Sequence, residues 1–255
     1  MKYSFLLPYC KRNSFRSSLI SFIHHYSGNP YHPRNDVEVV VIEDITNNES
    51  KQHHEELMAI IDQFKNQINF VYCLDDFRSY NSAKKYNIGF RKSSGQFIIL
   101  SNPETFHEVN ILFGFDEEFN INPNVYIICS CKAVTFTSPN INNFDEYQNS
   151  QFVRWYQHSR MNNRLLHFCS ALSRENYIRI GGFDERYCTG IAYEDDSFRH
   201  RVMMNGIPSI LRDDLVTIHI EHERGYLEQN QPLYALNGSL WARQLQTNDF
   251  FMRFV

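Results

Sequence analysis

The sequence lacks an apolar run long enough to cross a membrane. Its longest apolar stretches, Val37 to Ile42 and Phe97 to Leu100, have the length of a strand, whereas a membrane-spanning helix needs about 20 apolar residues. The apolar segment near the amino terminus ends before Lys11 and Arg12, and it is shorter than the core of about 7–15 residues in a secretory signal. We therefore expect a soluble, cytoplasmic protein with no membrane span.

Positive charge is also scarce. The 25 Lys and Arg residues stand against 29 Asp and Glu residues, which gives a formal net charge of -4. Non-specific nucleic-acid binding depends on a basic excess, so nucleic acid is not an expected partner. With 42% hydrophobic and 15% aromatic residues, the 255-residue chain can bury a core.

C-x-x-C pairs, repeats, low-complexity tracts and Pro/Gly-rich linkers are absent as well. Cys129 and Cys131 would share one face of a strand, but a lone C-x-C pair is a weak metal signal. Because no linker marks a boundary, we predict a single domain over residues 1–255.

Short β-type runs alternate with helical patterns in the first half. The predicted strands cover residues 3–7, 37–42, 68–73 and 97–100, and the predicted helices cover residues 14–26, 50–66 and 79–92. Strands that alternate with helices predict an α/β fold, in which a Rossmann-like, mostly parallel central sheet is flanked by helices.

The pattern is looser in the second half. We predict one or two strands over residues 125–136, and strands over 165–172 and 208–220, with a helix over 194–204. The aromatic- and Arg-rich segment 152–164 is a candidate mobile segment beside a ligand. In the tail, Leu233, Leu236, Leu240 and Trp241 have helical spacing and predict a helix that packs on the core.

Polar residues follow the predicted strands, where open α/β sheets bind ligands. The second strand ends at Glu43-Asp44, and an acid there can accept hydrogen bonds from a nucleobase or ribose; an ordinary turn is the alternative. The fourth strand ends at Asn102-Pro103-Glu104, whose two side chains offer oxygen ligands of the kind that Mg2+ and Mn2+ prefer. Here too, a polar turn is the alternative.

Two further segments carry candidate chemistry. Gly181-Gly182 is followed by Glu194-Asp195-Asp196 at the start of a predicted helix. Adjacent acids raise one another's pKa, although acids also stabilise helix amino termini. His219 and His222 follow the last predicted strand; histidine is a common metal ligand, but this spacing is no zinc signature by itself.

These segments resemble glycosyltransferases. A first block resembles family 2 glycosyltransferases, which have the glycosyltransferase A fold; it consists of Pro8-Tyr9-Cys10-Lys11-Arg12, Val39 to Asp44, Asn87-Ile88-Gly89 and Ser94 to Ile98. A second block resembles the C-terminal signature of beta-1,4-galactosyltransferases and polypeptide GalNAc-transferase-like domains; it consists of Phe168 to Ser173, Ile180 to Glu185, Glu194-Asp195-Asp196 and Arg201.

The resemblance implies a role for each matching residue. The residues implied to bind the nucleotide sugar are Pro8, Tyr9, Arg12, Glu43, Asp44, Lys85 and Asn102. For Lys85, surface exposure is an equal alternative. Glu104 and His219 are the implied metal ligands, with Asn-Pro-Glu in place of the family's Asp-x-Asp.

The same resemblance makes Asp195 the catalytic base, with Glu194 beside it. Asp196 and Gly182 are the implied contacts to the donor or acceptor sugar. Trp155 could stack on a sugar, and a core or interface role is an equal alternative for it.

The implied activity is inverting transfer of a hexose or N-acetylhexosamine from a UDP-sugar to an acceptor hydroxyl on a glycan or glycoprotein, with Mn2+ or Mg2+ as cofactor. The expected organisation is a nucleotide-binding half (1–104), an acceptor and catalytic half (105–226) and a C-terminal helical tail (227–255). The alternative is a catalytically inactive sugar-nucleotide or carbohydrate binding protein of the same fold.

Overall fold

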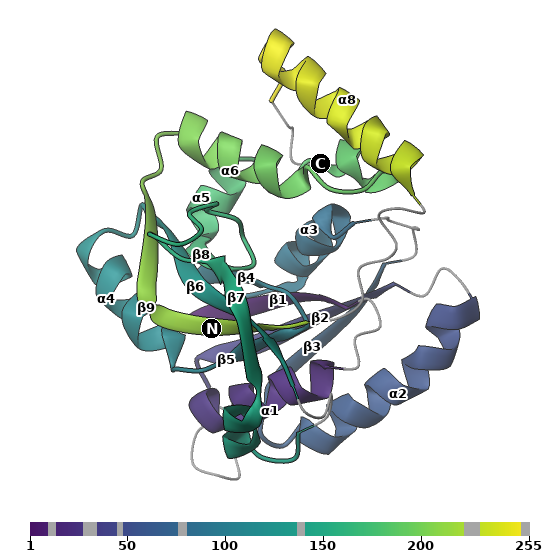
Figure 1. Ribbon diagram of the computed structural model, residues 1–255, viewed down its shortest axis with the longest axis vertical. Helices are drawn as coiled ribbons and strands as arrows, with labels where there is room; N and C mark the ends of the chain where they lie inside the picture. Colours follow the sequence, from purple (N-terminus) through teal and green to yellow (C-terminus); the bar gives the residue numbers. More distant parts are fainter. Residues whose placement is uncertain are drawn as a thin grey trace.

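A computed structural model describes residues 1–9, 14–27, 35–44, 48–75, 81–136, 141–221 and 230–250. In the first half, strands and helices alternate as predicted (Figure 1). The elements are β1 (Tyr3–Tyr9), α1 (Phe15–Tyr26), β2 (Val37–Asp44), α2 (Asn48–Phe64), β3 (Phe70–Asp75), α3 (Ala83–Lys92) and β4 (Phe97–Ser101).

The first four strands form a parallel sheet in the order β3-β2-β1-β4. Helices cover both faces, which explains the nearly continuous apolar runs of β1 and β2. Tyr9 pairs with Glu43 and Asp44 pairs with Asp75, so the carboxyl ends of β1, β2 and β3 share one edge. This is the edge where the sequence places candidate ligand-binding residues.

The second half adds shorter and more varied elements. They are β5 (Thr105–His107), α4 (Ile111–Ile121), β6 (Tyr126–Thr135), the 3-10 helix η1 (Phe144–Asn149), β7 (Gln151–Gln157), β8 (Cys169–Ser173), α5 (Arg174–Arg179), the 3-10 helix η2 (Glu185–Thr189), α6 (Glu194–Met204), β9 (Ser209–Ile220) and α8 (Gln231–Thr247).

The sheet becomes mixed beyond β4. Strand β8 lies between β4 and β6 and is antiparallel to both, β6 is parallel to β9, and β5 is antiparallel to β9. The expectation of a mostly parallel sheet therefore holds for the first half of the chain only. The physical reason is that the strands of the second half are not joined by the regular strand–helix–strand crossovers that keep the first four strands parallel.

The segment expected to be mobile is partly a strand. Residues 151–157 form β7, which pairs with β6 through an irregular register. That pairing satisfies the backbone of the first half of the segment, so the sequence-based interpretation of residues 152–164 as mobile is wrong for β7.

The core consists of two apolar clusters, one on each face of the sheet. Phe5 and Leu7 of β1 belong to the cluster beneath α1, α2 and α4, whereas Leu6 belongs to the cluster beneath α3, α5 and α6. Gly89 lets α3 approach β2 closely, since a Cβ atom there would lie 2.6 Å from Ile42 Cδ1. Within the described ranges, no helix is both long and apolar enough to cross a membrane.

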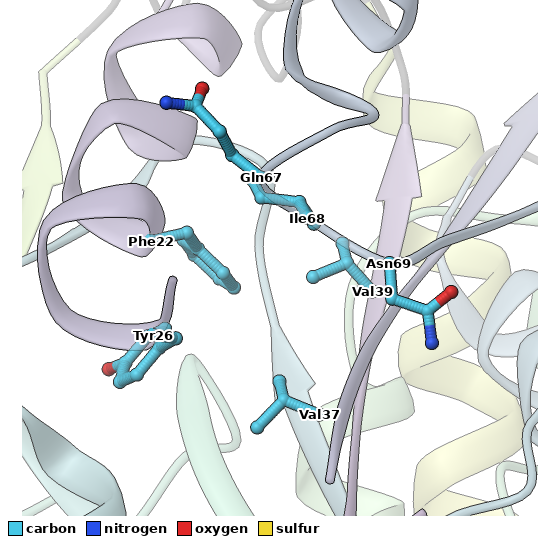
Figure 2. Close-up of a pocket in the computed structure, with 7 residues that line it drawn as sticks. All are labelled: Phe22, Tyr26, Val37, Val39, Gln67, Ile68 and Asn69. Atoms are coloured by element: carbon cyan, nitrogen blue, oxygen red, sulfur yellow. The ribbon is translucent and has the colours of Figure 1, made fainter. Parts of the chain in front are cut away.

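A small hollow lies between α1 and the amino-terminal ends of β2 and β3 (Figure 2). Its lining is largely apolar and consists of Phe22, Tyr26, Val37, Val39, Gln67, Ile68 and Asn69. Its volume of about 10 Å³ is close to the minimum for a single water molecule. The hollow is therefore too small for a nucleotide sugar, and it lies away from the edge that carries the candidate residues.

Candidate active site

Lys85 of α3 lies between two carboxylates at the ends of β2 and β3. Its Nζ atom is 3.4 Å from Asp44 Oδ2 and 3.9 Å from Asp75 Oδ2, while Lys84 Nζ lies 2.9 Å from Asp75 Oδ1. Lys85 is fully buried, which excludes the surface role that the sequence left open. Because a buried cation attracts nearby carboxylates strongly, Lys85 fixes Asp44, whose side chain is 15% exposed.

Glu43 and the end of β1 are more deeply enclosed. Glu43 accepts hydrogen bonds from His54 Nδ1 at 2.8 Å and from the Tyr72 hydroxyl, and these contacts join α2 and β3 to β2. Tyr9 packs edge-on against Phe15, with the ring centres 5.1 Å apart. Glu43 and Tyr9 thus form part of the packed sheet edge, as does Pro8 within β1.

Arg12 lies outside the described residues, and so does His222.

Glu104 and His219 lie together where β4 leads into β5. Thr105 of β5 pairs with His219 of β9, which brings Glu104 Oε1 within 3.8 Å of His219 Nε2. Both side chains are largely buried. The His219 ring stacks on Tyr156 of β7, with centres 5.1 Å apart and planes 2° apart.

Asn102 extends this group through Tyr86 of α3. The Tyr86 hydroxyl donates to Asn102 Oδ1 at 3.1 Å. Among the residues that the structure describes, no three His, Cys, Asp or Glu side chains gather as a metal cluster. The chain therefore offers a divalent cation one carboxylate, one imidazole and the amide oxygen of Asn102.

The three consecutive acids form the first turn of α6. Burial raises the pKa of Glu194 to about 8, and the neighbouring Asp195 adds to the rise. Burial also raises the pKa values of Asp195 and Asp196, whereas the positive charges of Arg164 and Arg199 lower them.

These acids are not explained by helix capping. The residue before the helix, Tyr193, makes no capping hydrogen bond through its side chain. Asp195 Oδ1 accepts from the adjacent Asp196 N–H at 2.8 Å, and backbone N–H groups of this turn lower the pKa values of Glu194 and Asp195. Glu194 Oε2 is nevertheless buried without a hydrogen-bond partner in the described structure. Because a buried carboxylate oxygen without a partner is costly, helix stability alone does not account for the position of Glu194.

Tyr86 connects the strand-end residues to the acidic turn. Burial holds its pKa well above the usual value, and the charges of Glu104 and Glu194 raise it further. Both acids therefore lie close enough to Tyr86 to act on it. Tyr86 therefore contacts the loop through Asn102 and is influenced by the charges of Glu104 and Glu194.

Sequence reasoning missed two aromatic residues of this region, Tyr86 and His167, and included Tyr156 only as part of the candidate segment 152–164. Tyr86 and Tyr156 contact the predicted residues directly, and His167 packs against Tyr86 with ring centres 5.2 Å apart. Burial lowers the pKa of His167 to about 3, so it is neutral. The one signal in the sequence was that Tyr86 stands next to Asn87, which belongs to the first block of the resemblance. A single aromatic residue otherwise forms no recognisable motif.

Two predicted sugar contacts have other neighbours. Gly181 and Gly182, with φ of 75° and 62°, end α5, and Gly182 N–H donates to the Tyr177 carbonyl at 2.9 Å. This is the ordinary role of glycine at a helix carboxyl end. Trp155 lies against His158 and beneath the Lys132 ammonium group, whereas its neighbour Tyr156 contacts His219. The structure brings neither Gly182 nor Trp155 into contact with the acidic turn.

No family model matches the sequence, and no curated protein matches it significantly. Solved structures do resemble the fold of this chain. S. aureus TarS is 15% identical, with a TM-score of 0.59 over 89% of this chain and 38% of that chain. The mannosyltransferase PcManGT from Pyrobaculum calidifontis, solved with GDP-Man and Mn2+, is 14% identical, with a TM-score of 0.59 over 89% of this chain and 59% of that chain.

GalNAc-T7, solved with UDP, GalNAc and Mn2+, is 13% identical, with a TM-score of 0.64 over 88% of this chain and 44% of that chain. The chain thus spans less than two thirds of the length of each of these proteins. These likenesses show the fold: the chain has the glycosyltransferase A fold, an α/β architecture whose central sheet is flanked by helices.

Proposed function

We propose that this chain is a metal-dependent glycosyltransferase that moves a hexose or N-acetylhexosamine from a UDP-sugar to an acceptor hydroxyl on a glycan or glycoprotein, with inversion at the transferred sugar. The observation that carries the proposal is the grouping after β4, where Glu104 Oε1 lies 3.8 Å from His219 Nε2 and Asn102 Oδ1 accepts a hydrogen bond from Tyr86. Solved neighbours that contain UDP-GlcNAc or GDP-Man support a nucleotide sugar as donor.

The donor nucleotide binds at the carboxyl edge of β1, β2 and β3. Asp44 is partly exposed, and the ammonium group of Lys85 holds one of its oxygens. The carboxylate can then accept a hydrogen bond from the N–H group of a uracil ring. Arg12 remains a predicted contact to the diphosphate.

A divalent cation fits the residues at the β4–β5 junction. Glu104 and His219 supply one oxygen and one nitrogen ligand, a set compatible with Mn2+ or Mg2+. Asn102, two residues before Glu104, could add its amide oxygen, and diphosphate oxygens would supply further ligands, as is usual where a protein offers few ligands of its own. When bound, the cation neutralises charge that develops on the diphosphate leaving group.

Asp195 acts as the general base. It removes the proton of the acceptor hydroxyl while that oxygen bonds to the anomeric carbon and the bond to the diphosphate breaks on the opposite face. Burial raises the pKa of Asp195 and so makes it a stronger base than an exposed aspartate. Glu194, with a pKa of about 8, is protonated at neutral pH and donates a hydrogen bond to a sugar oxygen.

A UDP-release assay with a panel of UDP-sugars and acceptors, with and without Mn2+, tests the proposal. Asp195→Asn should lower kcat by about 10²–10⁴-fold, the usual contribution of a general base, while calorimetry detects donor binding close to that of the wild type. Asp62→Asn, an exposed substitution on α2, is the matched control and should be fully active. Unchanged turnover in Asp195→Asn would remove Asp195 as the base.

The small number of metal ligands favours a second candidate. A catalytically inactive sugar-nucleotide or carbohydrate binding protein of the same fold needs no complete metal site, and the described residues hold no cluster of three His, Cys, Asp or Glu ligands. This candidate predicts that calorimetry detects UDP-sugar binding while no acceptor in the panel releases UDP. Release of UDP with any acceptor contradicts it.

A further inference from the structure

The segment that leads into the acidic turn has a strained backbone. Ala192 and Tyr193 have φ values of 64° and 68°, although neither is glycine or asparagine. Such conformations persist only where surrounding contacts impose them. Tyr193 immediately precedes Glu194, so whatever holds residues 192 and 193 also sets the direction in which the acids project.

Helix α8 supplies contacts to this segment. Asn237 Nδ2 donates to the carbonyl oxygens of Ala192 at 2.8 Å and Tyr187 at 3.0 Å. The Leu233 carbonyl accepts from the Ile191 N–H at 3.2 Å. Asn237 is also packed tightly against Gly190, where a Cβ atom would come within 2.3 Å of Asn237 Oδ1.

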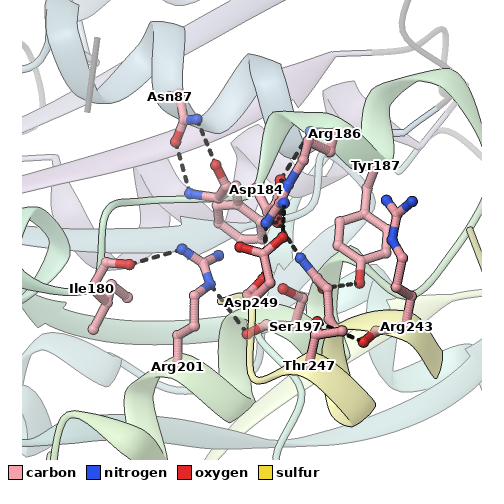
Figure 3. A network of polar contacts seen from close by, with 12 residues as sticks. Asn87, Ile180, Asp184, Arg186, Tyr187, Ser197, Arg201, Arg243, Thr247 and Asp249 are labelled. Carbon is pink, nitrogen blue, oxygen red and sulfur yellow. Dashed lines mark hydrogen bonds and ion pairs between the residues drawn. The ribbon is translucent and has the colours of Figure 1, made fainter. Parts of the chain in front are cut away.

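A second amide repeats the arrangement two helical turns along α8. Gln244 Nε2 donates to Asp184 Oδ2 at 2.7 Å, and Gln244 Oε1 accepts from the Tyr187 hydroxyl. Figure 3 shows Asp184 and Tyr187 within the surrounding network, in which Arg186 binds both Asp184 and Asp249. The carboxyl end of α8 is thereby fixed to η2.

The fully buried residues of α8 are polar, although Trp241 packs on the core as expected, with its ring centre 5.7 Å from that of His200 in α6. Asn237 and Gln244 are each 1% exposed and are the buried residues of the helix, whereas Leu236 is 50% exposed. A buried amide avoids a penalty only where its polar atoms are paired; Asn237 Nδ2 and both polar atoms of Gln244 are paired, whereas Asn237 Oδ1 has no hydrogen-bond partner in the described structure. The main effect of such buried hydrogen bonds is to restrict the contact to one geometry, and their contribution to stability is smaller. This property suits a helix that positions other residues.

We propose that α8 is a positioning element for sugar transfer. Asn237 and Gln244 hold residues 184–193, and this keeps Ala192 and Tyr193 in their strained conformation and Asp195 directed at the acceptor hydroxyl. The inference rests on the proposed function. It adds a requirement for α8, which touches neither the donor edge nor the Glu104–His219 pair among the contacts of the described residues.

Three substitutions test the contact from both sides. Asn237→Leu and Gln244→Leu remove the donated hydrogen bonds. Gly190→Ala places a methyl group against Asn237 from the other side of the contact, while the sequence of α8 stays unchanged. Each should lower kcat by about 10–100-fold and shift the pH profile of kcat, because the acids change their surroundings. The Kd for UDP should stay unchanged. Gln246→Leu, on the exposed face of α8, is the matched control and should behave as the wild type.

Hydrogen exchange gives a readout that does not depend on activity. Amide exchange of residues 191–196 should be faster in Asn237→Leu and Gly190→Ala than in Gln246→Leu, while melting temperatures confirm that the variants are folded. Wild-type kcat and exchange in folded Asn237→Leu and Gly190→Ala overturn the inference and leave the proposed function intact. An inactive wild-type chain overturns the proposed function, and with it the inference.

Discussion

At the scale of single residues, Glu194 has the most distinctive chemistry. An ordinary glutamate has a pKa near 4.5, and burial beside Asp195 raises that of Glu194 to about 8. Below pH 4.5 the folded and unfolded chains both hold this proton. Between pH 4.5 and 8 only the folded chain holds it, so the contribution of Glu194 to stability is lost progressively as the pH rises.

Glu194→Gln should therefore raise the melting temperature, and the gain should widen from pH 5 to pH 8. Each unit of pKa corresponds to about 1.4 kcal/mol, so the difference reaches a few kcal/mol at the alkaline end. Since glutamine resembles a protonated carboxyl group, the variant should keep most of its activity at pH 7 and lose the alkaline decline of the wild type.

Thermal denaturation and initial rates across this pH range measure both effects. Asp62→Asn serves again as the exposed control. A constant difference in melting temperature across the range would mean that Glu194 is ionised in the folded chain.

At this scale, functional residues could be predicted from the sequence only where chemically similar residues lie close together along the chain. Adjacent acids, and polar residues directly after strands, pointed to Glu194, Asp195 and Glu104. The structure adds the aromatic residues Tyr86 and His167, whose positions depend on how separate elements pack. Their type is common in any core, so nothing in the sequence distinguishes them from core residues.

At the scale of elements, α3 joins the two halves of the chain through Asn87. Asn87 Nδ2 donates to the Phe183 carbonyl at 2.9 Å and to Glu185 Oε1 at 2.8 Å, while Oδ1 accepts from Phe183 N–H and the Tyr177 hydroxyl. These hydrogen bonds are directed at Tyr177 of α5 and at residues 183–185, which follow α5. This gives a structural reason for an asparagine at this position.

Asn87→Leu should destabilise the fold by about 3 kcal/mol or more, since each buried polar group left unpaired costs about 1–3 kcal/mol. Urea denaturation followed by circular dichroism measures the loss. Asn120→Leu, on the exposed face of α4, makes the same chemical change and should be almost neutral. Equal effects of the two substitutions would show that the hydrogen bonds of Asn87 contribute nothing.

Elements were predictable where a single periodicity extends over the whole segment. The β-branched run of β2 and the amphipathic pattern of α2 are examples, and both elements occur where expected. By contrast, β5, α4 and α5 were not predicted. A three-residue strand is too short to show a period of two, and α4 carries apolar residues around much of its surface, which conceals its helical period.

At the scale of the whole molecule, the order of strands determines which residues meet. Insertion of β8 between β4 and β6, and pairing of β5 with β9, bring Glu104 to His219 across more than a hundred residues of sequence. Such pairings are long-range, and local pattern does not encode which strands become neighbours. The expected parallel order could therefore not anticipate the mixed half of the sheet.

Under the proposed function, the same arrangement should make metal and nucleotide binding interdependent. Because Glu104 and His219 are the two charged or imidazole ligands that the described residues offer, Mn2+ alone should scarcely change the melting temperature. UDP with Mn2+ should raise it by more than the sum of the separate effects, since diphosphate oxygens complete the coordination. At a concentration of UDP about 100 times its Kd, the stabilisation is about 2.7 kcal/mol, or roughly 5–10 °C for a domain of this size.

Thermal unfolding with UDP, Mn2+, both, and both with EDTA measures this coupling. Glu104→Ala and His219→Ala should remove the Mn2+-dependent part of the shift and leave the effect of UDP alone unchanged. Glu55→Ala, exposed on α2, is the control and should keep the full shift. If Mn2+ stabilises the wild type as strongly without UDP, or if both alanine variants keep the coupled shift, the cation is held by other residues. In that case the contact between β5 and β9 serves the fold and not the cofactor.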